Sequence, residues 1–218
     1  MNKPLIIIGA GGHAAVLVDI LRQQNCEIAA VISPEQKLTN KVFDGLHHLQ
    51  RDDDILQYAS EEVLLVNGIG SVPIKTQGKP SSIPLRIKIY QHFKSLGYQF
   101  ATVVSRRAII SPYAMLAEGV QVMPNVVIQV GAYIGDNSII NTAAVIEHDC
   151  QIAKHNHIAP GVTISGDVTT GENVHIGTGA SVIQGINIGE ASIIGAGAIV
   201  SKNLAANKIL YPARSIDQ

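Results

Sequence analysis

Residues 140–158 of the chain, INTAAVIEHDCQIAKHNHI, place an isoleucine at every sixth position. The same spacing continues from Val104 to Val200, and every position in the series except Thr170 is aliphatic. Four residues after most of these positions stands a small or short side chain, as at Ala144. A period of six matches neither the ~3.6-residue repeat of a helix nor the two-residue alternation of a long strand. This stretch therefore predicts a repeat architecture.

The simplest structure with this period is a coil whose sides are one short strand plus a turn. Three such sides close a triangular prism, so each coil takes roughly 18 residues and buries its aliphatic side chains against its neighbours. We expect residues 103–218 to form this β-helix, including a C-terminal tail. Tight corners favour glycine and asparagine. The expected corner residues are Gly119, Gly135, Gly171, Gly177, Gly189, Gly195, Asn125, Asn137 and Asn173.

The composition supports this architecture and excludes several classes of protein. Hydrophobic residues make up 46% of the chain and charged residues 15%, which argues against disorder. Aromatic residues reach only 4%, as a narrow prism requires. The net charge is −1 and the basic residues do not cluster, so no nucleic-acid partner is expected. Cys26 and Cys150 form no metal pair or disulfide framework. Without a signal peptide or a stretch of ~18 apolar residues, a cytoplasmic protein with no membrane insertion is expected.

Residues 1–102 alternate between strand and helix patterns, which predicts a small parallel α/β sheet of the Rossmann-like type. The pattern starts with an apolar strand and a glycine-rich turn that leads into a helix. The expected strands are 4–8, 28–32, 63–66 and 100–104, and the expected helices are 14–24 and 84–96. Residues 71–83 are rich in Pro, Gly and Ser and indicate an exposed loop, which could close over a ligand or stay a mobile surface.

The turn Gly9-Ala10-Gly11-Gly12-His13 lies where a phosphate can bind backbone N–H groups and a helix dipole. Three interpretations stay open: a sugar-nucleotide site, a purely structural turn, and a dinucleotide site. A nicotinamide dinucleotide site would need an acidic residue at the end of the second strand, and this chain has Ser33-Pro34 there.

His148 is the candidate catalytic residue of the solenoid. It is the third residue of its hexad, which points out of the prism, and one coil later Gly166 leaves space beside the imidazole. Histidine titrates near neutral pH and is the commonest general base in enzymes, and an adjacent carboxylate would orient it. Glu147 and Asp149 are both candidates for that carboxylate. The alternative is a surface or interface histidine.

Three further histidines lie in the repeat. His157 and His175 are one coil apart and should stack at the same place on the prism, which suggests a cofactor or interface role for His157 and a structural one for His175. A zinc site needs a third converging ligand that the spacing does not supply, so no metal is expected. His155 is expected to be solvated.

The motifs GAGGHA at 9–14, IEHDC at 146–150 and YPAR at 211–214, in this order, resemble one family of acyltransferases. The chain is similar over its whole length to the sialic-acid O-acetyltransferase and UDP-4-amino-sugar N-acetyltransferase family of bacterial glycan biosynthesis. The resemblance implies a left-handed β-helix and a homotrimer with active sites at the subunit interfaces. It also implies that His148 is the general base, with Asp149 raising its basicity.

The same resemblance implies the positions of both substrates. A nucleotide-sugar would bind Gly11, Gly12 and His13, with further contacts at Ser33, Pro34 and Gly70. Acetyl-CoA would lie between two prisms, with its thioester against His157; the other expected CoA contacts are Gly166, Thr178 and Ala196.

The expected activity is N-acetylation of a UDP-linked 4-amino-4,6-dideoxyhexose with acetyl-CoA as co-substrate. The alternatives are O-acetylation of a sugar or sialic acid and, in a different class of protein, a non-catalytic solenoid scaffold.

Overall fold

A computed structural model describes residues 3–70 and 84–212 of the chain. The predicted loop 71–83 lies outside the described residues, as do the last two residues of the 211–214 motif. The chain forms two compact units. The described part of the first, here called the N-terminal unit, comprises residues 3–70 and 84–106, and that of the second, here called the solenoid, comprises residues 107–212.

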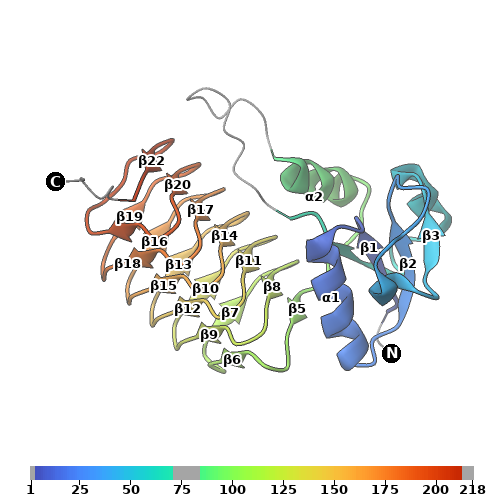
Figure 1. Cartoon of the computed structure of the whole chain (residues 1–218), viewed down its shortest axis with the longest axis horizontal. Helices are drawn as coiled ribbons and strands as arrows, with labels where there is room; N and C mark the ends of the chain where they lie inside the picture. The colour runs from blue at the N-terminus through green and yellow to red at the C-terminus, as the bar shows by residue number, and fades with distance from the viewer. Residues whose placement is uncertain (1–2, 71–83, 213–218) are drawn as a thin grey trace. The chain divides into compact units, whose positions relative to one another are not determined.

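The N-terminal unit contains a parallel sheet in the strand order β3-β2-β1-β4 (Figure 1). These strands are β1 (Leu5–Ile8), β2 (Ile28–Ile32), β3 (His47–Leu49) and β4 (Leu64–Asn67). Every residue of β1 is buried, because this strand pairs with β2 on one side and with β4 on the other. The predicted parallel α/β sheet is confirmed. The edge strand β3 was missed, because the sequence His-His-Leu carries no strand pattern.

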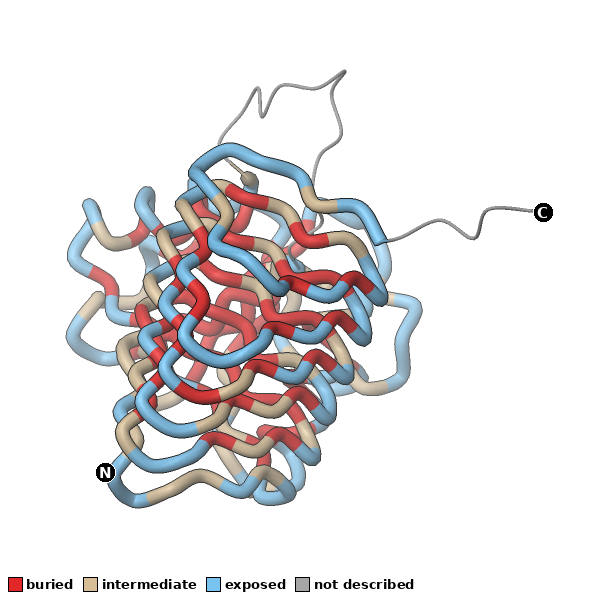
Figure 2. The backbone as a smooth tube through the Cα atoms, turned by 90° about the vertical axis from the view of Figure 1, so that its left-hand side faces the viewer, coloured by how far each residue is buried: buried red, intermediate tan, exposed pale blue. Residues whose placement is uncertain are grey.

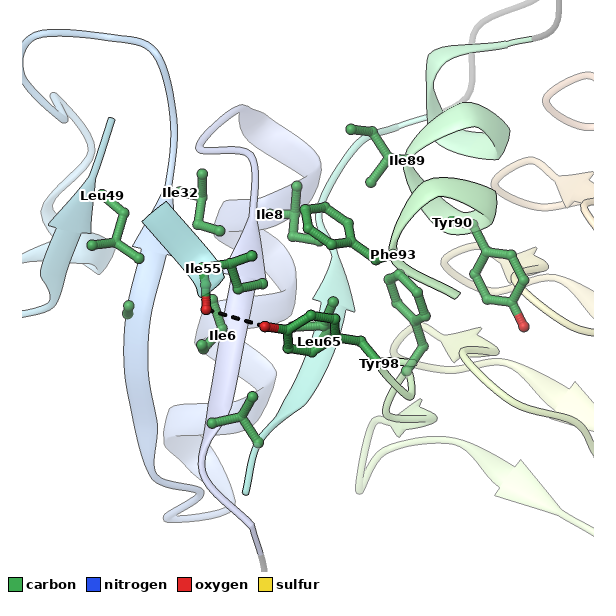
Figure 3. Packing of buried hydrophobic residues seen from close by; sticks show 13 residues of the cluster. Ile6, Ile8, Ile32, Leu49, Ile55, Leu65, Ile89, Tyr90, Phe93 and Tyr98 are labelled. Carbon is green, nitrogen blue, oxygen red and sulfur yellow. Dashed lines mark hydrogen bonds between the residues drawn. The ribbon is translucent and has the colours of Figure 1, made fainter. Parts of the chain in front are cut away.

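Two helices accompany this sheet, α1 (Gly12–Gln23) and α2 (Leu85–Ser95), and short 3₁₀ segments cover Lys41–Phe43 and Asp52–Gln57. Side chains of α2, including the fully buried Phe93, pack on isoleucine and leucine side chains of the strands (Figure 3). The aromatic residues absent from the prism interior therefore serve this core. The predicted strand 100–104 is wrong in extent, because Phe100 makes only an isolated bridge to Leu65 before β5 (Val103–Val104).

The solenoid consists of two-residue strands on three parallel sheets, as the hexad pattern predicted (Figure 1). Each strand pairs with the strand one coil later, for example Ile146 with Ile164. One sheet contains β6 (Ile109–Ile110), β9 (Val127–Ile128), β12 (Val145–Ile146), β15 (Thr163–Ile164), β18 (Ser181–Val182) and β21 (Ile199–Val200). A second contains β7 (Met115–Leu116), β10 (Tyr133–Ile134), β13 (Gln151–Ile152), β16 (Thr169–Thr170) and β19 (Asn187–Ile188). The third includes β8 (Gln121–Val122), β11 (Ile139–Ile140), β14 (His157–Ile158), β17 (His175–Ile176), β20 (Ile193–Ile194) and β22 (Ile209–Leu210).

The first residues of the hexads fill the prism. Ile140, Ile146, Ile152 and Ile158 are all fully buried, and Figure 2 shows buried positions recurring along the inside of successive coils. Thr170, the single break in the aliphatic series, is also buried, and its hydroxyl accepts a hydrogen bond from the backbone N–H of Ala153. A polar side chain is tolerated there because its oxygen has a partner.

The corners lie at the fourth residue of the hexads, where the backbone is left-handed in every hexad from Leu116 to Ile194. The prediction is correct for Gly119, Asn125, Asn137 and Asn173, which all have positive φ angles. It is wrong for Gly135, Gly171, Gly177, Gly189 and Gly195, which stand at the second residue of their hexads and are absent from the positive-φ positions. Glycine is needed at this second position because the next coil passes close by. A Cβ atom on Gly135, for instance, would lie 2.6 Å from the backbone nitrogen of Lys154.

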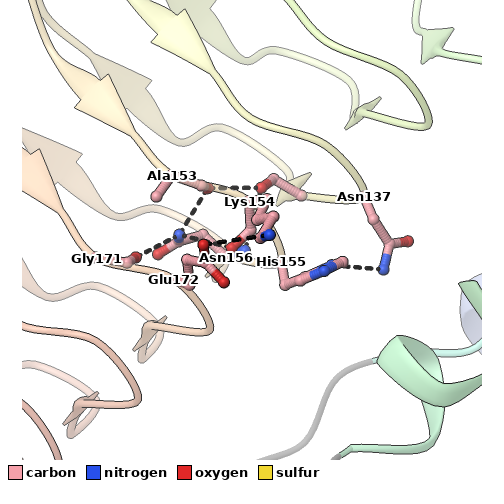
Figure 4. Close-up of polar contacts among 8 residues, drawn as sticks. Asn137, Ala153, Lys154, His155, Asn156, Gly171 and Glu172 are labelled. Atoms are coloured by element: carbon pink, nitrogen blue, oxygen red, sulfur yellow. Dashed lines mark hydrogen bonds and ion pairs between the residues drawn. The ribbon is translucent and has the colours of Figure 1, made fainter. Parts of the chain in front are cut away.

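A buried amide side chain, that of Asn156, ties neighbouring coils together (Figure 4). Its amide nitrogen donates to the carbonyl oxygens of Ala153, at 2.7 Å, and Gly171, at 2.9 Å. Beside it, His155 is half-buried and its Nδ1 lies 3.1 Å from the amide nitrogen of Asn137. The expectation that His155 is solvated is therefore wrong; its φ of +63° places it at a left-handed corner, where its ring meets the preceding coil.

The regular register ends at the last coil. Ile193 pairs with His175 on one side, one full coil earlier, but with Ile209 on the other, so the last coil is shorter than those before it. In the described residues, neither helix is long and apolar enough to cross a membrane.

Candidate active site

The central feature of the solenoid surface is a pair formed by His148 and Asp149, directly after β12. Nδ1 of His148 lies 2.9 Å from Oδ2 of Asp149. Side chains of consecutive strand residues would point apart. Asp149, however, occupies a corner with a φ of +60°, which brings its carboxylate beside the imidazole. In this geometry Asp149, and not Glu147, contacts the histidine.

Glycines on the neighbouring coils make room for both side chains of the pair. A Cβ atom on Gly166, one coil later, would collide with Nε2 and Cε1 of the His148 ring. A Cβ atom on Gly131, one coil earlier, would collide with Oδ1 of Asp149. The predicted space at Gly166 is confirmed, and that residue is buried. Gly131 was missed, although its separation of one coil from Asp149 is visible in the sequence.

This arrangement favours general-base chemistry at Nε2 of His148. A carboxylate accepts hydrogen bonds, so Nδ1 of the imidazole is the donor and Nε2 keeps its lone pair. The same carboxylate would stabilise the imidazolium once Nε2 has taken a proton. The side chains of His148 and Asp149 are 49% and 66% exposed, so a substrate can reach them.

Cys150 follows the pair in sequence but points into the prism. It is fully buried, and its thiol donates a hydrogen bond to the carbonyl oxygen of Ser165 at 3.2 Å. Burial raises the pKa of the Cys150 thiol, which disfavours the thiolate that a covalent mechanism would need. The sequence-based expectation of an inward, buried cysteine is confirmed.

His157 lies on another side of the prism from His148, in β14 rather than after β12. Its ring stands edge-on to that of His175, with ring centroids 4.8 Å apart and an interplanar angle of 87°. Thr178 and Ala196, which follow β17 and β20 of the same sheet, are exposed on successive coils. The predicted site residues of one solenoid therefore form two groups on different sides of the prism. One group is His148 with Gly166, and the other lies along the sheet that contains β14.

The glycine-rich turn of the N-terminal unit has open space around it. A Cβ atom on Gly11 or Gly12 would meet no atom within 4 Å, so packing within the chain does not require glycine at either position. Both are exposed at the first turn of α1, where backbone N–H groups are available to a ligand. Gly70 adjoins this turn, because its Cβ would lie 3.5 Å from Cβ of His13. Gly70 and His13 are therefore neighbours.

A cavity of about 250 Å³ opens at the carboxyl ends of β1 and β2. Pro34 lines it, whereas Ser33 is buried and bonded to Leu49 through its backbone. The remaining lining residues are Ile8, Gly9, Ile32, Gln50, Asp52, Ile69, Leu85 and Ile89. Gln50 and Asp52 were missed by sequence reasoning, because they follow the unrecognised strand β3.

A buried arginine supports the turn after β4. The guanidinium Nη1 of Arg86 donates to the carbonyl oxygens of Asn67 and Ile69, both at 2.8 Å. The amide nitrogen of Asn67 donates in return to the Arg86 carbonyl oxygen at 3.0 Å. Burial lowers the pKa of Arg86 to about 9. No sequence signal identified this residue, which fixes the segment leading to Gly70.

Two family models match parts of the chain. Residues 4–77 match the family described as the PglD N-terminal domain, and residues 131–166 match the bacterial transferase hexapeptide family of six repeats. Together they cover the glycine-rich turn, the His148–Asp149 pair and Gly166.

Solved structures match nearly the whole chain. A mutant of perosamine N-acetyltransferase from Caulobacter crescentus, in complex with CoA and GDP-perosamine, is 31% identical with a TM-score of 0.82, over 99% of this chain and 97% of that one. The acetyltransferase domain of PglB from Neisseria gonorrhoeae is 26% identical with a TM-score of 0.82, over 99% of this chain and 100% of that domain. The latter domain is also known in complex with acetyl coenzyme A. The expected left-handed β-helix is confirmed by these matches.

Proposed function

We propose the reaction of this chain on the basis of its family. The chain belongs to the hexapeptide-repeat acyltransferases of the sialic-acid O-acetyltransferase and amino-sugar N-acetyltransferase family. It transfers the acetyl group of acetyl-CoA to the amino group of a nucleotide-linked amino-sugar. The observation that carries the proposal is the His148–Asp149 pair, held over Gly166 on an exposed edge of the solenoid.

His148 acts as the general base in this proposal. The neutral sugar amine attacks the thioester carbonyl carbon, and Nε2 of His148 removes a proton from the nitrogen as the new C–N bond forms. Asp149 accepts the Nδ1–H hydrogen bond and stabilises the imidazolium. A backbone N–H group holds the tetrahedral oxyanion, which then expels CoA as its thiolate and leaves the acetamide. The imidazolium returns its proton to the departing sulfur.

The acceptor binds the N-terminal unit in this proposal. Its phosphates lie at Gly11, Gly12 and His13, with Gly70 beside them, and its nucleoside uses the cavity near Ser33 and Pro34. Support comes from the unexplained glycines of the turn and from the known complex of the Caulobacter enzyme with GDP-perosamine.

The donor lies along the side of the prism that carries His157, Thr178 and Ala196. This side and the one that carries His148 are different in one chain, so a complete site needs a second copy. We infer a homotrimer of parallel prisms in which His148 of one subunit faces the same groove as His157 of the partner subunit. Exposed apolar side chains on the solenoid, such as Ile109, Met115 and Ile199, are suited to burial between copies.

The preferred acceptor is a UDP-linked 4-amino-4,6-dideoxyhexose of bacterial surface glycan biosynthesis. The test is CoA release by the purified protein with acetyl-CoA and each of four acceptors: that UDP-sugar, GDP-perosamine, CMP-sialic acid and free sialic acid. Mass spectrometry of the product before and after hydroxylamine treatment separates an acetamide, which survives, from an ester, which is cleaved.

Turnover of one amino-sugar with a hydroxylamine-resistant product would support the N-acetyltransferase. Turnover of GDP-perosamine alone would show that the acceptor carries GDP instead of UDP, and the proposed N-acetyl transfer would stand. A hydroxylamine-sensitive product would favour O-acetylation instead. Absence of both turnover and acetyl-CoA binding would leave the non-catalytic scaffold as the better description.

A further inference from the structure

His157 is held between side chains of the two neighbouring coils. On the preceding coil, the amide nitrogen of Asn141 lies 3.3 Å from Nε2 of His157. On the following coil, the ring of His175 stands edge-on to the His157 ring, with centroids 4.8 Å apart. Within the sheet, the residues in register with His157 are Ile139 and His175, so His175 is the titratable neighbour along this direction.

The orientation of the Asn141 amide is fixed by Thr142. The backbone N–H of Thr142 donates to Oδ1 of Asn141 at 2.8 Å, and a donor must face the amide oxygen and not the amide nitrogen. The NH₂ group of Asn141 is therefore the group that faces His157. Because NH₂ only donates, Nε2 of His157 must accept, and the proton of the neutral imidazole lies on Nδ1.

His175 reinforces this state from the other side. Its own Nδ1 is buried and has no hydrogen-bond partner among the described atoms. Burial, and then the proximity of His157, lower the pKa of His175 to about 4, so it is a neutral ring near neutral pH. A second proton on His157 would meet the Asn141 NH₂ group at Nε2 and would place a cation beside the half-buried ring of His175, whose Nδ1 is buried.

We propose that His175 is a positioning residue that, with Asn141, holds His157 as a neutral imidazole with its proton on Nδ1. This inference rests on the proposed function, which places His157 beside the thioester. His157 then donates a hydrogen bond to the thioester carbonyl oxygen and does not compete as a base. The two histidines have opposite tautomers: Asp149 accepts from Nδ1 of His148 and leaves Nε2 basic, whereas Asn141 donates to Nε2 of His157 and leaves Nδ1 the donor.

The direct test is the tautomer of His157 in the full-length protein. Long-range ¹H–¹⁵N correlation spectra of protein labelled with ¹⁵N-histidine report which ring nitrogen carries the proton, and the His157→Gln spectrum assigns the signals. We expect a protonated Nδ1 and an unprotonated Nε2 at pH 7. A wild-type spectrum with the proton on Nε2, or with a doubly protonated ring at pH 7, would overturn the inference.

Two substitutions separate positioning from packing. His175→Gln removes the ring, and we expect mixed tautomers at His157 with a kcat about tenfold lower and an unchanged KM for the sugar-nucleotide. His175→Phe keeps an edge-on ring and should restore both the tautomer and kcat. If His175→Gln keeps the wild-type tautomer and kcat while only its melting temperature falls, His175 is merely structural.

Asn141→Asp provides a second variant of nearly the same shape. A carboxylate there accepts from Nε2–H, so it should move the His157 proton to Nε2 or charge the ring. The spectra need no turnover, so they can be read even if every candidate acceptor fails. Failure of the acceptor panel would remove the proposed function, whereas an unaltered tautomer in Asn141→Asp would remove this inference.

Discussion

The solenoid and the N-terminal unit build their sites in different ways. In the solenoid, residues separated by one coil in the sequence lie side by side in space, as His148 and Gly166 do. In the N-terminal unit, one cavity gathers residues as distant in sequence as Gly9, Gln50 and Ile89. A periodic backbone therefore lets a site be located by counting along the chain. A sheet of the N-terminal kind requires the strand order to be known first.

The difference also concerns what glycine does in each part. Gly131 and Gly166 are required by contacts within the chain, because a side chain there would collide with the His148–Asp149 pair. Gly11 and Gly12 have no such contacts. The glycines of the solenoid site therefore make room for side chains of the same chain, whereas those of the N-terminal turn leave space that a ligand could occupy.

The largest effect is expected from removing the base on the solenoid. His148→Ala should lower kcat by about 100-fold or more, within the ~10²–10⁴ range of general acid–base catalysis, without a change in the melting temperature. The control is Gln184→Ala, two coils further along the same outward column and exposed. Steady-state rates of CoA release decide the matter. Near wild-type turnover in His148→Ala would show that His148 is not the general base.

The second effect concerns acid stability of the solenoid. The pKa of His175 is lowered from 6.5 to about 4 in the folded chain. Between these two pH values His175 is therefore protonated in the unfolded chain and neutral in the folded chain. Stability is therefore complete above pH 6.5 and falls as the pH drops towards 4, by about 3 kcal/mol per chain. Urea unfolding at pH 7 and pH 4.5 measures this, with His175→Gln as the comparison. Equal losses of stability in both proteins would contradict the prediction.

A pair of matched glycine substitutions separates the two sites directly. Gly166→Ala should displace the His148 imidazole and lower kcat by about tenfold, since misplaced catalytic groups cost rate. Gly12→Ala meets no neighbouring atom, so the fold should be retained, while the KM for the sugar-nucleotide should rise several-fold.

Initial-rate kinetics with both substrates varied give the two constants for each protein. The assignment of catalysis to the solenoid and of sugar-nucleotide binding to the N-terminal unit would be contradicted if Gly12→Ala changed kcat alone or if Gly166→Ala changed only the KM for the sugar-nucleotide.

The smallest effect is expected at a corner of the solenoid. Ala143 has a φ of +57°, a conformation that is unfavourable for a residue with a Cβ atom. Ala143→Gly should raise the free energy of unfolding by about 0.5–1 kcal/mol. Ala206→Gly is the control, because Ala206 is exposed and is absent from the positive-φ positions, and it should be neutral or destabilising. Chemical denaturation of the three proteins tests both statements.

The sequence was sufficient for most of the solenoid and for only part of the N-terminal unit. Each buried Ile of the hexads, the outward His148 and the space at Gly166 follow from a repeat whose geometry is the same in every coil. The repeat does not distinguish Asp149 from Glu147, because the choice depends on the left-handed backbone at residue 149, and only the family resemblance implied Asp149. The glycines at the second hexad position were wrongly predicted to be corners, because the spacing does not show which residues of a hexad have a left-handed backbone.

The N-terminal unit hid more of its site. The helix and the glycine-rich turn were visible as local patterns, but β3 has no pattern of its own, so Gln50 and Asp52 could not be placed. Arg86 could not be recognised either. It stands in an amphipathic helix where an arginine is normally exposed, and its burial depends on carbonyl groups of the distant segment 67–69.

The fixed length of the coil also limits how this protein can change length during evolution. A deletion of one whole coil would leave every later side chain on its original side, and a deletion of one hexad would move each to the next side while the aliphatic residues stayed inside. Any other length would turn apolar side chains outward, except at the end of the stack, where the last coil is already shorter than the others. Lineages of this protein should therefore differ in the solenoid by whole coils, and the groove could be lengthened by duplication without altering the residues around His148.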